Sequence, residues 1–231
     1  MLNFFYRVKN YCFSKVEKMA RFLLKRKPSW EHIKQYNHAE AHPDRYRNIM
    51  IALKKDFFPV LKNKENAEVL DLGCANGWFD FEICPYVKRM DAYDLSPHLI
   101  KTAKRQSKKK GIQNISFFTQ DIASISIKKK YDSVLCMGLF TCIVDEAVFL
   151  STLKKVHSCL RIGGIYFCKD SLNKNITSKR DQGGYFHIYR KESEYVKAIE
   201  MVGFELLSKR QLSDTIFEQG MFSGSYVFRK I

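Results

Sequence analysis

Short apolar segments alternate with amphipathic segments along most of the sequence. The apolar segments end at polar or small residues, which is the pattern of buried strands in a parallel sheet. The segments between them carry apolar residues at helical spacing. Strands that alternate with helices predict an α/β fold. Strands are expected at 69–71, 89–95, 115–119, 133–137, 165–168, 204–209 and 225–229, and helices at 76–86, 97–110, 145–160 and 192–202.

The N-terminal quarter of the chain has a different pattern. Residues 1–27 mix apolar side chains at roughly helical spacing with many Lys and Arg, which predicts a basic amphipathic helix. This helix has two interpretations: it binds an anionic membrane surface, or it packs as a lid on the rest of the protein or in a dimer. A connector over 28–42 leads to a second helix over 43–62. We therefore divide the chain into an N-terminal helical cap, 1–62, and a second domain, 63–231.

The composition is basic, with a formal net charge of +16. This charge is compatible with nucleic acid, an anionic membrane surface or an acidic small molecule as a partner, and also with a lysine-rich surface in water. The seven cysteines include no C-x-x-C pair, so we expect reduced thiols in a cytoplasmic protein and no metal site. No apolar run is long enough to span a bilayer.

The stretch after the first strand, VLDLGCANGWF, carries the most specific motif. Small residues at Gly73, Ala75 and Gly77 let the backbone turn sharply and approach a ligand closely. A helix that starts here directs its first N–H groups toward the same crevice. A dinucleotide fingerprint would need glycine at positions 75 and 78, where the chain has Ala75 and Trp78, so a dehydrogenase is disfavoured.

The pattern D-x-G-x-A-x-G, from Asp71 to Gly77, resembles the glycine-rich first motif of the class I S-adenosylmethionine-dependent methyltransferases. The phrase L-R-x-G-G at 160–164, before the fifth expected strand, is similar to a phrase widespread in that family. The resemblance covers residues from about 65 to the C-terminus. It implies a doubly wound, mostly parallel, seven-stranded Rossmann-like sheet with helices on both faces, an antiparallel last strand, and S-adenosyl-L-methionine as cofactor.

Two further acids follow strand ends in the order that this resemblance implies. Asp94, followed by Leu95, lies about where a ribose-binding carboxylate follows a glycine loop; otherwise it caps the next helix. Asp121 and Ile122 occupy the position of an adenine-contacting pair, although Asp121 alone also suits a turn. The resemblance places the methionine part of the cofactor near Met137. The cofactor-binding residues predicted are Asp71, Gly73, Ala75, Gly77, Asp94, Leu95, Asp121, Ile122 and Met137.

The acceptor is expected near the long polar stretch 169–190, which follows the fifth strand at the edge where open α/β sheets bind ligands. His187 is the residue type best suited to general-base chemistry at neutral pH, or else a wall histidine, and Asp170 would position an amine acceptor. Arg180 and Arg190 suit a phosphate or carboxylate on the acceptor. The predicted substrate-binding residues are Tyr36, Phe140, Lys169, Arg180, Tyr189 and Arg190, with His38 and Arg47 as further candidates.

The leading hypothesis is methyl transfer from S-adenosylmethionine to O or N of a polar small molecule, such as a sugar or an anionic metabolite. The sequence has no N/D-P-P-Y motif and no recognisable nucleic-acid module, which disfavours nucleic-acid methylation. A methyltransferase that acts on RNA or protein is the second hypothesis. A non-catalytic, membrane-associated cofactor-binding scaffold is the third.

Overall fold

The computed structural model of the 231-residue chain describes residues 43–182, 185–213 and 220–231. The expected helix over 1–27, Tyr36 and His38 lie outside the described residues. The strands are β1 (Glu68–Leu72), β2 (Arg89–Asp94), β3 (Ile115–Thr119), β4 (Tyr131–Met137), β5 (Leu160–Asn173), β6 (Ser178–Gln182), β7 (Tyr185–Tyr189), β8 (Phe204–Ser213) and β9 (Met221–Lys230).

One seven-stranded sheet has the order β3-β2-β1-β4-β5-β9-β8, and β6 pairs with β7 in a separate hairpin. β1 to β5 are parallel, whereas β9 is antiparallel to both of its neighbours. The first strand, β1, lies in the middle of the sheet. From β1 the chain moves outward through β2 to the edge strand β3, and then crosses back to β4 on the other side of β1. The carboxyl ends of β1, β2 and β4 therefore meet where the strand order reverses, which is the ligand-binding edge of such sheets.

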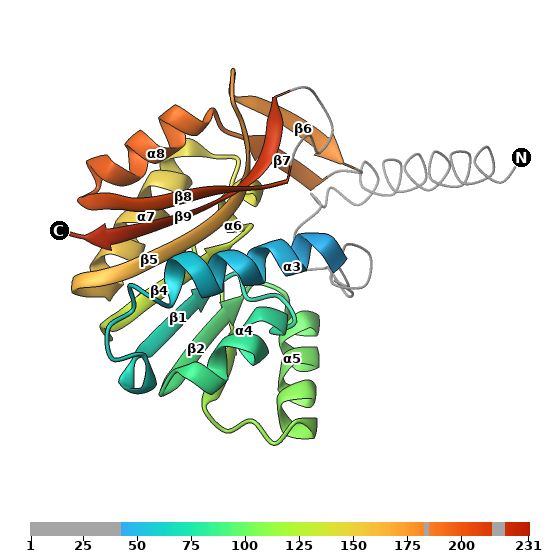
Figure 1. Cartoon of the computed structure of the whole chain (residues 1–231). Helices are drawn as coiled ribbons and strands as arrows, with labels where there is room; N and C mark the ends of the chain where they lie inside the picture. The colour runs from blue at the N-terminus through green and yellow to red at the C-terminus, as the bar shows by residue number, and fades with distance from the viewer. Residues whose placement is uncertain (1–42, 183–184, 214–219) are drawn as a thin grey trace, which may run out of the picture.

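The helices cover both faces of this sheet (Figure 1). They are α3 (Pro43–Ala52), continued by a π-helical turn (Leu53–Phe57), a 3₁₀ turn (Lys64–Asn66), α4 (Trp78–Ile83), a second 3₁₀ turn (Cys84–Tyr86), α5 (Pro97–Lys109), α6 (Leu139–Cys142), α7 (Glu146–Cys159) and α8 (Glu192–Met201). Within the described part of the chain, no helix has the length and apolarity needed to cross a membrane.

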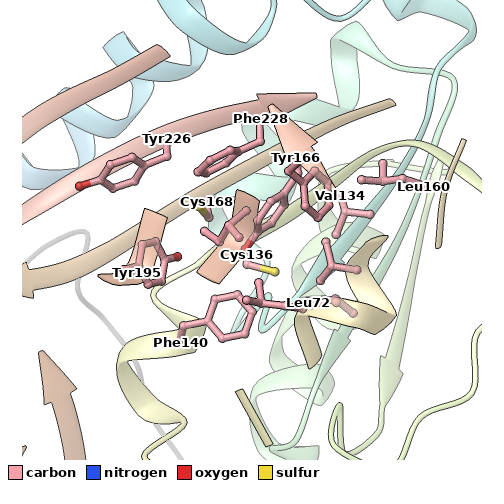
Figure 2. Close-up of a cluster of buried hydrophobic side chains, with 14 of the residues drawn as sticks. Leu72, Val134, Cys136, Phe140, Leu160, Tyr166, Cys168, Tyr195, Tyr226 and Phe228 are labelled. Atoms are coloured by element: carbon pink, nitrogen blue, oxygen red, sulfur yellow. The ribbon is translucent and has the colours of Figure 1, made fainter. Parts of the chain in front are cut away.

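Each face of the sheet has its own apolar core. Side chains of α7 and α8 pack on Leu72, Val134 and Cys136 of one face, and Figure 2 shows this cluster, which includes Phe140 and Tyr195. On the other face, α3, the π-helical turn and α4 pack on alternate strand residues such as Leu135 and Phe167. The alternation follows from the two-residue period of a strand, which sends neighbouring side chains to opposite faces.

The predicted fold is confirmed: the sheet is doubly wound, mostly parallel and seven-stranded, with an antiparallel last strand. The L-R-x-G-G phrase at 160–164 lies inside β5, where the pairing with β4 jumps from Leu160 to Ile165. The end of the fifth strand at 168 was predicted wrongly, and the polar stretch 169–190 is largely strand. β5 continues to Asn173 because β9 pairs with it residue by residue, and the β6–β7 hairpin occupies most of the remainder.

Candidate functional site

The loop between β1 and α4 has the backbone conformation that its small residues predict. Gly73, Ala75 and Gly77 all have positive φ, at 86°, 50° and 79°. The N–H groups of Gly73 and Cys74 both donate to the carbonyl of Tyr93, which holds the loop against the end of β2. Left-handed backbone is strained for alanine and natural for glycine. The backbone of Ala75 is therefore strained, and a glycine at this position of the motif would not be.

Asp94 ties the loop to the start of α5. Its Oδ2 accepts from the Ala75 N–H at 2.9 Å, and its Oδ1 accepts from the Ser96 N–H at 2.8 Å. Ser96 is the N-cap of α5, and its hydroxyl oxygen accepts from Leu99 N. A carboxylate oxygen has two lone pairs, so Asp94 can accept ligand hydroxyls while it holds the loop.

Three carboxyl groups crowd beneath this loop. Asp71 of β1 is 1% exposed and Asp80 of α4 is fully buried. Burial raises the pKa of Asp80 to about 7, with the nearby Asp94 acting in the same direction. Burial, with the charges of Asp80 and Asp94, raises the pKa of Asp71 far above its usual range. Like charges this close cannot all ionise readily, so the cluster holds a proton near neutral pH.

A cavity of about 390 Å³ opens above this loop. It crosses the middle of the sheet. Its wall includes Asp94 of β2 and Asp121 just after β3 on one side of β1, and Met137 of β4 and Lys169 of β5 on the other. The structure thus brings most of the predicted cofactor residues together. The predicted residues in its wall are Asp71, Gly73, Ala75, Asp94, Leu95, Asp121, Ile122, Met137 and Lys169.

Gly77 is the one predicted cofactor residue outside the cavity wall. It is the N-cap of α4, and a Cβ on it would come within 2.8 Å of the Phe117 ring. The glycine is needed for the turn and for close packing under the loop. Asp121 lies in the wall and also serves as a turn residue, since its Oδ1 accepts from Ala123 N at 2.8 Å.

Aromatic side chains that were not predicted as site residues line part of the cavity wall. Tyr46 of α3 stacks on Phe79 at 4.8 Å between ring centroids and meets Trp78 edge-on at 4.5 Å, so α3 is fastened over the loop by rings. Burial raises the pKa of Tyr46 to about 12. The available signal was the aromatic pair directly after the glycine loop. Arg45 lies in the wall, whereas the candidate Arg47 forms an exposed ion pair with Asp44.

Three predicted substrate residues lie in the protein interior instead. Phe140 is fully buried in the cluster of Figure 2. Its ring packs edge-on against that of Phe149. Arg190 is 4% exposed: it stacks on the Phe149 ring at 3.9 Å and donates to the carbonyls of Phe140 and Ile143. Its guanidinium also pairs with Glu146 at 3.0 Å. Tyr189 is 2% exposed, on the adjoining end of β7.

Asp170 and His187, the predicted catalytic pair, are not brought together in the cavity wall. Asp170 is 1% exposed, accepts from the N–H and hydroxyl of Thr141 at 2.9 Å, and accepts from the Tyr195 hydroxyl at 2.8 Å. These bonds fix α6 against β5, so Asp170 positions a helix whose residues line the cavity. His187 lies on β7 opposite Arg180 of β6, in the hairpin. The catalytic roles of both remain predictions.

Comparison with known proteins agrees with this geometry. The methyltransferase domain family matches residues 63–220, more than half of the chain. A curated relative is the ubiquinone biosynthesis O-methyltransferase of Xanthomonas campestris pv. campestris (strain B100). It is 24% identical over 127 residues, which are 54% of this chain and 52% of that protein. The chain therefore spans about half the length of the curated relatives that it matches.

Solved structures share the fold at low sequence identity. An S-adenosylmethionine-dependent methyltransferase from Clostridium acetobutylicum ATCC 824 has a TM-score of 0.62 and 17% identity, covering 95% of this chain and 99% of that chain. The N-methyltransferase NodS from Bradyrhizobium japonicum WM9, in complex with S-adenosyl-L-homocysteine, has a TM-score of 0.61 and 16% identity, covering 81% and 86%. The family match shows that the chain belongs to the methyltransferase domain family, and the structural likeness shows that it shares the fold of these S-adenosylmethionine-dependent methyltransferases.

Proposed function

We propose that the protein transfers the methyl group of S-adenosylmethionine to a hydroxyl oxygen of a small aromatic molecule. The observation that carries this proposal is a cavity that joins the cofactor loop to an aromatic and cationic wall. The ring cluster of Tyr46, Trp78 and Phe79 favours a planar, apolar acceptor. The name O-methyltransferase on the curated relatives supports oxygen as the receiving atom.

The β2 and β3 side of the cavity suits the nucleoside part of the donor. Asp94 retains acceptor capacity for two ribose hydroxyls, and Ile122, 6% exposed, offers an apolar surface to a base. Asp121 beside it can accept from an exocyclic amine. When bound, S-adenosylmethionine supplies a methyl group on a positively charged sulfur, which the buried acids near the loop attract.

The β4 and β5 side suits the acceptor. Met137, the last residue of β4, is paired in register with Lys169 of β5, and Gly138, with φ of 88°, opens the turn into α6. Arg45 of α3 lies in the same wall and supplies a cation. This charge favours an acceptor that carries or develops negative charge, such as a phenol that ionises as it reacts. Methyl transfer needs alignment and exclusion of water more than it needs covalent help.

The cytoplasm is the compartment that we propose. The six cysteines within the described residues are free thiols, five of them buried, which suits a reducing environment. Contact of residues 1–27 with a membrane stays a prediction, because these residues lie outside the described part of the chain.

The first experiment is calorimetric binding of S-adenosylmethionine and S-adenosylhomocysteine to the wild type, Asp94→Asn and Asp132→Asn. Asp132 is a matched control: it also accepts from a backbone N–H, that of Glu68 at 2.8 Å, but lies outside the cavity wall. We expect micromolar binding, weakened at least tenfold by Asp94→Asn and unchanged by Asp132→Asn. Folded wild-type protein that binds neither compound would overturn the proposal.

The acceptor is then tested with a radiolabelled methyl donor and matched phenols and anilines. Transfer to catechols or other phenols is the expected result. Transfer to anilines alone would overturn the assignment of oxygen. Transfer to RNA or to protein in place of every small molecule would favour an enzyme that acts on macromolecules.

A further inference from the structure

One side chain of the cavity wall combines burial, charge and position in a way that the donor site does not explain. Lys169 is only 7% exposed and lines the cavity from β5, opposite the last residue of β4. Its backbone carbonyl accepts from Gly138 N at 2.6 Å, which fixes this part of β5 against the turn into α6. Among the described residues, its side-chain nitrogen has neither a hydrogen bond nor an ion pair.

The neighbouring acid does not neutralise Lys169. Successive residues of a strand point to opposite faces, so Lys169 shares the α3 face with Phe167, while Asp170 shares the α7 and α8 face with Cys168. The Asp170 carboxylate is already bonded to Thr141 and Tyr195. An amine without a carboxylate partner in a buried site favours its neutral form.

The charged and titratable groups that act electrostatically on Lys169 come from three elements. Arg45 of α3 repels a proton on the amine, whereas Asp170 of β5 and Cys142 of α6 oppose that effect. Burial is the largest influence, and the net effect lowers the pKa of Lys169 to about 7. About half of the enzyme would then carry a neutral amine at neutral pH. A neutral amine in an acceptor pocket can take a proton, which an ordinary lysine cannot do.

We infer that Lys169 is the general base that removes the proton from the acceptor hydroxyl. This inference rests on the function proposed above and names the group that makes an oxygen acceptor reactive. The amine nitrogen takes the hydroxyl proton, and the oxygen electron pair forms the bond to the methyl carbon. The carbon–sulfur bond breaks with its electrons left on sulfur, which gives a neutral thioether. The lysine ammonium then releases its proton to solvent.

The competing role for the same side chain is a permanent cation that, with Arg45, clamps an anionic acceptor. The two roles differ in what arginine can replace. Guanidinium holds its proton under all working conditions, so arginine at position 169 would keep a clamp and abolish a base. They also differ in kinetics, because a clamp acts mainly on KM and a base on kcat.

The first test needs no turnover. In protein labelled with ¹³C-lysine, the Lys169 signal is assigned by its absence from Lys169→Arg, and its pH titration is followed by NMR. We expect a midpoint near 7, moved upward by Arg45→Met. A Lys169 midpoint near 10.5, the ordinary lysine value, would overturn the inference whatever the enzyme's activity.

The second test uses a hydroxyl acceptor identified in the transfer assay. For Lys169→Met and Lys169→Arg alike, kcat should fall about 100-fold or more, as for other lost general bases. Affinity for S-adenosylhomocysteine should stay within about twofold, because the base does not hold the donor. The wild-type kcat should rise with pH to a plateau above about pH 7, and neither variant should show that plateau. Lys209→Met serves as the neutral control.

The outcomes separate the two proposals. Wild-type protein that binds the donor and methylates a phenol, with Lys169→Arg as active as the wild type, would refute the base and leave the methyltransferase assignment standing. A raised KM with unchanged kcat would establish the clamp instead. Wild-type protein without donor binding or transfer would remove both proposals together.

Discussion

Gly77 tests how tightly the cofactor loop is packed against the sheet. Alanine there meets two separate penalties. The φ of 79° costs an L-residue about 1–2 kcal/mol. The new Cβ would also lie 2.8 and 2.9 Å from two ring carbons of Phe117 and 3.2 Å from the Phe81 ring. Overpacking of this kind costs about 1–3 kcal/mol. The sum for Gly77→Ala is a loss of about 2–5 kcal/mol in the free energy of unfolding.

Gly111→Ala is the matched control for the backbone penalty. Gly111 also has positive φ, at 68°, but a Cβ there would meet nothing within 4 Å. Its alanine variant should therefore lose only about 1–2 kcal/mol. Urea unfolding gives both free energies, and for a chain of this size Gly77→Ala should lower the melting temperature by about 4–20 °C.

A double-mutant cycle isolates the contact with the ring. In a Phe117→Leu background the clash is smaller. The loss of unfolding free energy caused by Gly77→Ala should therefore be smaller than in the wild type by about 1 kcal/mol or more. Equal losses for Gly77→Ala and Gly111→Ala, with no coupling to Phe117, would refute the packing argument. The glycine would then be needed only for its backbone conformation.

Two further predictions concern buried charges. Folded Asp80 keeps its proton up to about pH 7, against 3.8 when unfolded, so stability should fall as pH rises through that window. Asp80→Asn should flatten the fall and stabilise the protein at about pH 8, as urea unfolding at several pH values would show; an unchanged slope would contradict this. Arg190→Lys should lower the free energy of unfolding by about 2–4 kcal/mol. Lysine cannot pair with Glu146 and donate to the carbonyls of Phe140 and Ile143 while it also stacks on Phe149. Arg161→Lys, at an exposed ion pair, is the control and should lower the free energy of unfolding by less than about 1 kcal/mol. Thermal unfolding measures both variants. Equal losses for Arg190→Lys and Arg161→Lys would contradict the buried role of Arg190.

The donor half of the site could be predicted because local sequence determines it. Gly73, Ala75 and Asp94 act through backbone conformation and through position after a strand end, and both leave marks in the sequence. Strand order then brings separate segments to one cavity without any further information. Gly77 shows the limit of this reasoning: the motif identified the glycine, but only the packing of Phe117 shows that it lies beneath the loop.

The acceptor half could not be predicted in this way, because its residues are placed by partners far away in the chain. The polar run from Lys169 to Asn173 looks like a loop, yet it is a strand, since β9 supplies backbone partners about fifty residues later. Once it is a strand, its two-residue period decides the chemistry. Asp170 turns to the α7 and α8 face and is bonded there, while Lys169 turns to α3 and the cavity. The face of β5 on which each residue lies therefore separates a positioning acid from a candidate base, and neither composition nor spacing along the chain could distinguish them.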